Sequence, residues 1–314
     1  MSELREAIAL EEITREPLTP AQVALHRFLR HKMALVGVGI LVILILYVTL
    51  GPLFLSEADA NYVDLRNKLS PPSREHPFGT DLAGRDILAR SIYGGQISII
   101  IGILAVVVSI LIGVLIGAVA GYYGGVTDSL LMRFTEAVFN IPQLFLLIVL
   151  AKFFATDMPT ITFGGRTFSG SVVVIVLVIG LTSWMYLARI VRSNFLSLKE
   201  QEFVTAARCT GARNVSIIFA HILPNTTAPI IVTATLEVAT AILAEAYISF
   251  LGMGVQPPTA TLGNMLNEAY NHLETAPWMW FFPGALILLI VMAINFVGDG
   301  LRDAFDPHSL AGFK

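Results

Sequence analysis

Residues 98–120 read SIIIGILAVVVSILIGVLIGAVA, which is 23 residues in succession without a charged side chain. A helix needs about 20 apolar residues to cross the hydrocarbon core of a bilayer. The run therefore predicts a transmembrane helix, and it decides the fold class. The whole chain agrees, because 55% of its 314 residues are hydrophobic and only 14% are charged, whereas soluble domains carry about 25% charged residues.

Working outward from this run, we predict six spans. Two more are clear: the uncharged run 33–55, and 278–297, which opens on tryptophans suited to the membrane interface. Three are weaker. The run 137–151 contains Pro142, which we expect to kink it; 171–188 is short, and 226–250 carries two glutamates. The predicted fold class is an all-α polytopic membrane protein with six transmembrane helices.

Six spans place both termini on one side of the membrane. That side would hold 13 Lys and Arg residues and the other side 7, so the termini are predicted to be cytoplasmic. A helix on the membrane surface is expected just before the first span, capped by Thr19. The predicted divisions are an N-terminal segment (1–32), a first span with an extracytoplasmic segment (33–95), a five-span core (96–297) with a polar loop at about 189–225, and a cytoplasmic tail (298–314).

Three glycines in the second span are spaced four residues apart: Gly113, Gly117 and Gly121. This spacing leaves one helix face without side chains, so that another backbone can approach closely. The face could pack against a partner subunit, but packing within the chain is favoured.

Some polar groups are predicted to lie at membrane depth, where a central charge costs about 2.5 kcal/mol or more. Glu237 and Glu245 are eight residues apart and fall on similar faces of one helix; Asn140 interrupts the third span. These residues could line a substrate path. For the glutamates, a structural hydrogen bond to a neighbouring helix is an equally good interpretation, and Glu245 could also lie near the outer surface.

The sequence predicts neither an enzyme nor a metal protein. It contains no GxxxxGK[ST] phosphate loop, and its one cysteine cannot build a Cys-cluster metal site. His76, Asp81 and Asp86 have no recognised ligand spacing, and a short helix that pairs Asp86 with Arg90 explains the charges there. No cofactor is expected, and the net charge of −3 gives no reason to expect nucleic acid.

The polar loop contains residues 202–225, EFVTAARCTGARNVSIIFAHILPN. Ser197 begins a capping box and predicts a helix start, and Gly211 suits a helix end. Phe203, Ala206 and Ala207 would share one face. A second short helix is predicted at about 215–223, ended by Pro224. This shape suits docking into a partner's groove, but a linker resting on the membrane fits the pattern almost equally well.

The loop resembles the E-A-A-x3-G-x9-I-x-L-P signature of ABC-importer permeases, with Thr205 in place of the Glu and His221 in place of the Ile. Further segments resemble the dipeptide/oligopeptide branch of that family, in its C-type permease. Gln96 departs from the Arg that is usual there. These segments are HPFGTDLAGRDILARSIYGGQISI, AGYYGGVTDSLLMR, ARIVRSNFLSLKEQEFVTAAR, AEAYISFLGMGVQPP and NFVGDGLRDAFDP.

The resemblance implies the type I ABC importer permease fold in a prokaryotic inner membrane. It also implies a second permease, two cytoplasmic ATPases and an extracytoplasmic binding protein as partners. The substrate would be a peptide, with nickel, glutathione or oligosaccharide as alternatives. The residues expected at the ATPase contact are Glu202, Phe203, Ala206, Ala207, Arg208 and Gly211.

Two other classes of protein compete with this interpretation. An ion-coupled transporter would use Glu237 and Glu245, but it predicts an inverted repeat that the hydropathy does not show. A membrane scaffold or sensor is disfavoured by the carboxylates at membrane depth.

Overall fold

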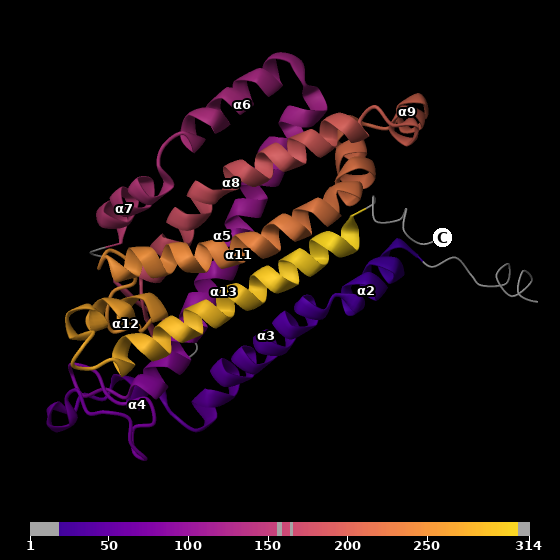
Figure 1. Ribbon diagram of the computed structural model, residues 1–314. Coiled ribbons are helices and arrows are strands. Elements are labelled where there is room, and N and C mark those ends of the chain that lie inside the picture. Colours follow the sequence, from indigo (N-terminus) through magenta and orange to yellow (C-terminus); the bar gives the residue numbers. More distant parts are fainter. Residues whose placement is uncertain (1–18, 156–158, 164–165, 307–314) are drawn as a thin grey trace, which may run out of the picture.

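The computed structural model describes residues 19–155, 159–163 and 166–306, and it is a bundle of long helices (Figure 1). In this part of the chain five helical runs are long and apolar enough to cross a membrane, and a bent pair of helices makes up to six. The long helices are α3 (Lys32–Leu50), α5 (Ile87–Tyr123), α8 (Ser171–Leu198), α11 (Thr227–Phe250) and α13 (Trp278–Phe305). The all-α, multi-span fold class is therefore confirmed.

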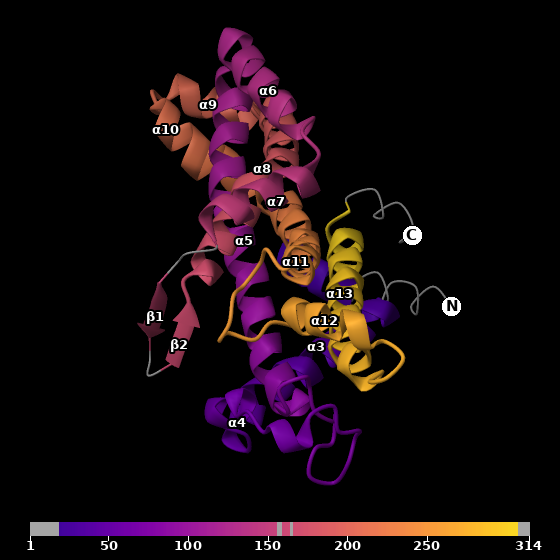
Figure 2. The same cartoon turned by 90° about the vertical axis from the view of Figure 1, so that its left-hand side faces the viewer.

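Short elements lie mostly at the two ends of the bundle. One end, here the α9 end, holds α2 (Pro20–Arg30), α9 (Glu202–Cys209) and α10 (Asn214–Ser216); the opposite α12 end holds α4 (Glu57–Asn61) and α12 (Leu262–Ala269) (Figures 1 and 2). The 3-10 helices are η1 (Gly51–Leu53), η2 (Leu65–Asn67), η4 (Leu223–Thr226) and η5 (Tyr270–His272), and η3 (Ile217–Ile222) is a π-helix. Strands β1 (Thr160–Phe163) and β2 (Arg166–Ser169) form an antiparallel pair. The pair lies in the chain between α7 (Gln143–Phe154) and α8.

The helix α5 begins well before the apolar run that predicts it. Asp86 is its N-cap, and its carboxylate accepts a hydrogen bond from the Ala89 amide at 2.9 Å. The short helix predicted around Asp86 and Arg90 is thus the first turn of α5. The predicted pairing of these two charges is wrong, because the Asp86 carboxylate turns to the backbone and to His76, 2.8 Å away.

The third predicted span is broken, as Pro142 predicts. Helix α6 (Gly125–Phe139) ends before Asn140, α7 (Gln143–Phe154) starts after Pro142, and the two axes are bent by 81°. A proline disfavours the helical conformation of the residue before it and lacks the amide hydrogen that a continuing helix needs. The break turns the chain across the face of the bundle.

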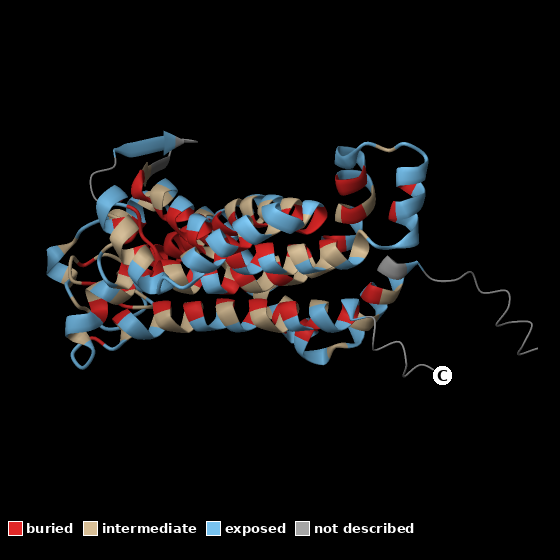
Figure 3. Cartoon of the chain, turned by 90° about the horizontal axis from the view of Figure 1, so that it is seen from above, coloured by how far each residue is buried: buried red, intermediate tan, exposed pale blue. Residues whose placement is uncertain are grey.

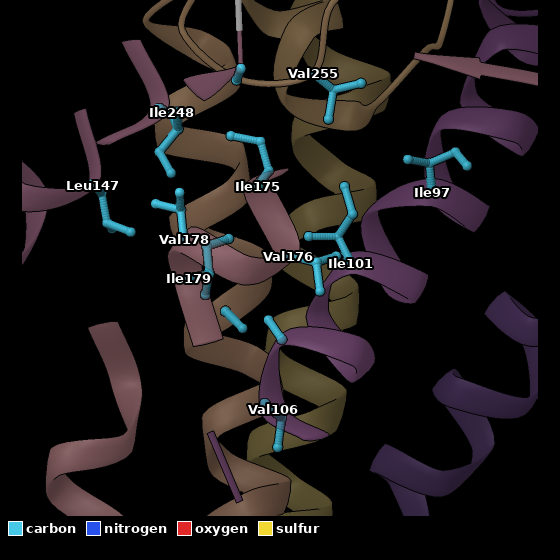
Figure 4. Packing of buried hydrophobic residues seen from close by; sticks show 14 residues of the cluster. Ile97, Ile101, Val106, Leu147, Ile175, Val176, Val178, Ile179, Ile248 and Val255 are labelled. Carbon is cyan, nitrogen blue, oxygen red and sulfur yellow. The ribbon is translucent and has the colours of Figure 1, made fainter. Parts of the chain in front are cut away.

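The three spaced glycines pack within the chain, which confirms the favoured prediction. A Cβ on Gly117 would lie 2.5 Å from the Ala188 carbonyl oxygen on α8, and one on Gly121 would lie 2.5 Å from the Phe195 Cβ. The backbones of α5 and α8 are therefore in close contact. A buried apolar cluster adjoins this seam, and Figure 4 shows 14 of its members, ten of them labelled.

The outward faces of the long helices remain apolar. Buried residues gather inside the bundle (Figure 3), while Ile43 on α3 and Leu111 on α5 are 68% and 66% exposed. Lipid covers such faces in a membrane protein. Before the first span, Thr19 caps α2 as predicted, and Gln22 adds the second hydrogen bond of a capping box. The segment 1–18 and residues 307–314 of the predicted tail lie outside the described residues.

Candidate functional site

Helix α9 is a short, separately capped helix at one end of the bundle. Its first turn contains Glu202 and its last turn Arg208, an order that matches the helix dipole. Gly211 adopts φ +81°, and the amide of Ala212 donates to the Ala207 carbonyl at 3.0 Å. These are the features of a glycine-terminated helix, so the predicted helix end at Gly211 is confirmed.

The start of α9 differs from the prediction. Helix α8 continues through Ser197 to Leu198, and Gln201 is the N-cap of α9 without a side-chain hydrogen bond. The capping box predicted at Ser197 is therefore wrong. Packing explains the difference, since Phe195 is fully buried in the apolar cluster beneath α9 and holds the last turn of α8 in helical form.

The two faces of α9 have different surroundings. Val204 and Ala207 are buried, whereas Phe203 and Ala206 are exposed. The prediction that Phe203, Ala206 and Ala207 share one face is therefore wrong in part. Phe203 and Ala206 lie on the exposed face, whereas Ala207 lies on the buried face with Val204, three residues earlier. Five of the six residues predicted for the ATPase contact are exposed, namely Glu202, Phe203, Ala206, Arg208 and Gly211.

The C-terminal end of α5 lies beneath α9 and contacts the chain on both sides of it. The Tyr122 hydroxyl donates to Asn214 Oδ1 at 2.8 Å, just after α9, and Lys199 Nζ donates to the Gly121 carbonyl at 3.0 Å, just before it. The Arg208 guanidinium lies 5.9 Å from the centre of the Tyr122 ring. The buried side chains of α9 pack into the same cluster as residues of α5, α8 and η3. Polar links on both sides thus fix α9 to α5.

The second loop helix is not a separate helix. Residues 214–250 form one helical run that passes through the π-helix η3 and the 3-10 helix η4 into α11. Pro224 was expected to break the chain, and this is wrong because the proline lies in the first turn of η4, where its missing amide hydrogen costs nothing.

A cavity of about 1090 Å³ extends from the α9 end into the bundle. Its walls are the α6–α7 break, α8, α11 and the last turns of α13. Neutral polar side chains dominate the polar part of the lining, while Arg302, Asp303 and Asp306 stand on α13 at the α9 end. The other polar lining residues are Asn140, Gln143, Thr182, Ser183, Tyr186, Asn194, Asn225, Thr233, Glu237 and Thr240.

Comparison with known proteins identifies the chain. The family model described as binding-protein-dependent transport system inner membrane component matches residues 113–310. A second model, the N-terminal TM domain of oligopeptide transport permease C, matches residues 19–72. The chain belongs to the family of binding-protein-dependent transport system inner membrane components. The permease carries both the shared core and the N-terminal module that marks the C-type.

Its relatives cover nearly its full length. The oligopeptide transport system permease protein OppC of Bacillus subtilis (strain 168) is 40% identical over 95% of this chain and 92% of its own. OppC of Escherichia coli (strain K12) is 40% identical over 91% of this chain and 90% of its own length. The dipeptide transport system permease protein DppC of Alkalihalophilus pseudofirmus is 39% identical over 92% of this chain and 90% of its own length. Among solved structures, an amino acid ABC transporter matches 65% of this chain and 88% of its own, with 15% identity and a TM-score of 0.47.

The two glutamates of the permease have different surroundings. Glu237 lines the cavity; one of its oxygens accepts a hydrogen bond from Ser109 at 3.0 Å, and Oε1 is buried without a partner among the described residues. Glu245 is fully buried, accepts hydrogen bonds from Ser98 at 2.8 Å and Ser249 at 2.7 Å, and is not among the cavity residues. Its position favours the structural alternative that the sequence leaves open.

A charge cluster that the sequence does not predict in full joins α12 to the start of α5; its members Asp81 and Arg90 are buried. Glu268 on α12 accepts hydrogen bonds from Arg85 at 2.7 Å and from Arg90 at 3.3 Å, and Asp81 accepts one from Arg85 at 2.6 Å. Burial works to lower the pKa of Arg85, but the carboxylates of Glu268 and Asp81 outweigh it, and the pKa is raised. Glu268 is more than 170 residues from its partners, so no local spacing signals the contact.

Proposed function

We propose that the permease is one of two membrane subunits of an ATP-driven importer that carries peptides. The support is its similarity, across more than nine-tenths of its length, to relatives whose names describe oligopeptide and dipeptide transport. Two ATPase subunits would supply the energy, and a binding protein would deliver the peptide. The ion-coupled alternative is not favoured, since the family is defined by dependence on a binding protein.

In this proposal the α9 end faces the cytoplasm. The excess of Lys and Arg on the predicted inner side supports this orientation. Helix α9 would dock onto an ATPase through the exposed residues Glu202, Phe203, Ala206, Arg208 and Gly211, while Ala207 would support this surface from within the apolar cluster. The predicted boundaries of the N-terminal segment, the first span with its extracytoplasmic segment, the core and the tail, at residues 32, 95 and 297, remain part of the proposal.

The cavity would be the inner part of the peptide path. Its volume of about 1090 Å³ slightly exceeds the range of small-molecule pockets, about 300–1,000 Å³, and is sufficient for a short peptide. Asn140 and Glu237 would line this path, among neutral side chains that can pair with peptide amides. The second permease would complete the remaining wall. Glu245 would act as an internal tie between α5 and α11.

One observation carries the proposal: an exposed helix is fixed by polar links to α5 at the same end of the bundle as a polar cavity. Helix α5 is in close contact with α8, which lines the cavity, so a force applied to α9 would reach the cavity wall through α5 and α8.

Reconstitution tests the proposed function. The chain, its second permease, the ATPases and the binding protein would be placed in liposomes, and uptake of radiolabelled trialanine would be measured with and without ATP. We expect uptake that requires ATP and the ATPases. Uptake driven by an ion gradient without ATPases would contradict the proposal. Competition by nickel, glutathione or an oligosaccharide, with no binding of trialanine, would reassign the substrate.

A further inference from the structure

Helix α6 is the least embedded of the long segments around the cavity. Only Met132 and Thr135 are buried among its 15 residues. It leaves α5 through Gly124 and Gly125, both with positive φ, a backbone conformation that glycine adopts at no steric cost. Within this chain, few apolar contacts determine where α6 lies relative to the bundle.

A bidentate ion pair joins α6 to α8. Arg192 on α8 donates from Nε and from Nη2 to the two carboxylate oxygens of Asp128 on α6, the second contact measuring 2.6 Å. The side chains are 34% and 15% exposed. Paired parallel hydrogen bonds between a guanidinium and a carboxylate fix orientation as well as distance. Asp128 also lies in the first turn of α6, where a negative charge suits the helix dipole.

The remaining contacts between α6 and α8 involve aromatic rings and one aliphatic side chain, because Val138 on α6 packs against an apolar cluster of α8. The rings of Phe134 and Trp184 are stacked with centroids 6.2 Å apart, and the Arg189 guanidinium lies 4.2 Å from the centre of the Phe139 ring. Contacts of these kinds do not fix orientation in the way that paired hydrogen bonds do. Among the described residues, Asp128 and Arg192 form the bidentate contact between the two helices.

Arg192 lies on the part of α8 that packs against α9. Helix α8 is continuous to Leu198, and α9 begins at Glu202. Phe195, one turn after Arg192, is buried in the same cluster as Val204 and Ala207 of α9. A displacement of α9 therefore displaces the end of α8 that carries Arg192.

The far end of α6 forms part of the cavity wall. Residues 139–143, which include the end of α6 and the break at Pro142, line the cavity. The chain bends there by 81°, so a shift of α6 along its axis moves this wall across the cavity.

From this geometry we infer that Asp128 and Arg192 are positioning residues that make α6, and with it the cavity wall at 139–143, follow the movement of α9. The inference rests on the proposed function. The pair touches neither the peptide nor the ATPase; it transmits displacement between elements that do.

The first test measures peptide uptake per ATP hydrolysed by the reconstituted complex. Asp128→Asn and Arg192→Gln should each lower this ratio about fivefold or more, the lower end of typical coupling between sites, while ATP hydrolysis and complex assembly persist. The reversed pair, Asp128→Arg with Arg192→Asp, should recover at least half of the loss. Arg66→Gln, an exposed arginine at the α12 end, is the control for loss of one positive charge and should match wild type.

The second test measures movement without relying on uptake. Spin labels would replace the exposed residues Leu130 on α6 and Leu181 on α8 in a Cys209→Ser background. With the pair intact, the label distance should be the same in nucleotide-free and vanadate-trapped complexes. In Asp128→Asn the distance distribution should shift or broaden on trapping.

Three outcomes would overturn the inference, and the first two are an unchanged ratio of uptake to ATP in Asp128→Asn and the same label distances with and without the pair in both states. A parallel loss of ATP hydrolysis and uptake would reduce the pair to a structural tie and also contradicts it. Wild-type complex that shows no ATP-driven uptake would instead contradict the proposed function, so the two failures are distinguishable.

Discussion

The two ends of the permease are held by different kinds of contact. At the α12 end, Asp81 and Arg90 are buried and form a charge cluster with the partly buried Arg85 and Glu268, and the rings of Phe78 and Phe282 stack 3.9 Å apart. At the α9 end the helices surround a polar cavity, and the bidentate Asp128–Arg192 pair is partly exposed. The difference indicates a structure closed at one end and open at the other.

Inside the bundle, the two glutamates of α11 differ in the same way as the two ends of the permease. Glu245, nearer the α12 end, has both carboxylate oxygens hydrogen-bonded to serines, while Glu237, beside the cavity, has one oxygen without a partner among the described residues. Buried polar groups with all partners in place make a structure rigid, whereas partly satisfied ones do not. Substitutions at the α12 end should therefore reduce stability, and those near α9 should reduce coupled transport.

The largest effect is expected for Asp81→Ala. The Asp81 side chain is 4% exposed, and its removal takes partners from Arg85 and Arg90 as well as from two backbone amides. Breaking a buried ion pair costs about 3–5 kcal/mol because a charge is left unpaired. Thermal unfolding of the purified complex should show a clearly lowered midpoint. A midpoint equal to that of wild type would show that the cluster is not a structural tie.

A smaller loss of stability is expected for Glu245→Ala. It leaves the hydroxyls of Ser98 and Ser249 without their acceptor in a dry environment, at a cost of about 1–3 kcal/mol. The matched change Glu237→Ala leaves one buried hydroxyl, that of Ser109, without its acceptor, so it should cost less than Glu245→Ala, at the lower end of this range, about 1 kcal/mol. Unfolding midpoints of the two variants, measured side by side, check the order. Equal or reversed losses would contradict the contrast between the glutamates.

A clear effect on transport, with a modest loss of stability, is expected for Gly211→Val. A valine at φ +81° is strained by about 1–2 kcal/mol, although a Cβ there would meet no atom within 4 Å. The strain should shift the end of α9 and lower peptide uptake while ATP hydrolysis persists in the assembled complex. Gly39→Val, at a site that is also open to a Cβ, is the matched control. Wild-type uptake by Gly211→Val would contradict the role of α9.

Much of the fold could be predicted from local sequence signals. Apolar runs located the spanning helices, Thr19 predicted the cap of α2, and Pro142 predicted the break between α6 and α7. Each of these signals acts within a few residues of its effect. Where a local signal failed, tertiary packing overrode it: Ser197 can cap a helix, but the burial of Phe195 extends α8 through it.

The candidate site was harder to predict, because its contacts join distant segments. Asp128 and Arg192 are 64 residues apart, and Tyr122 and Asn214 are 92 apart. Sequence spacing shows neither pair. It also could not decide between Glu237 and Glu245, which have the same residue type and similar helical faces but different neighbours on α5.

The most direct test of the account asks from which side the cavity is open. Thr240→Cys, in a Cys209→Ser background, places a thiol at an exposed position in the cavity, and Ser249→Cys places one at a buried position beside Glu245. Membrane-impermeant thiol reagents would be added to inside-out and right-side-out vesicles that contain the nucleotide-free complex.

We predict that the thiol at position 240 reacts only from the cytoplasmic side, and that trapping with ADP and vanadate suppresses this reaction. The thiol at position 249 should remain unreactive from both sides in the nucleotide-free complex. Reaction at position 240 from the outer side of the nucleotide-free complex, or none from the cytoplasmic side, would contradict the central claim that this cavity is the inner part of the transport path.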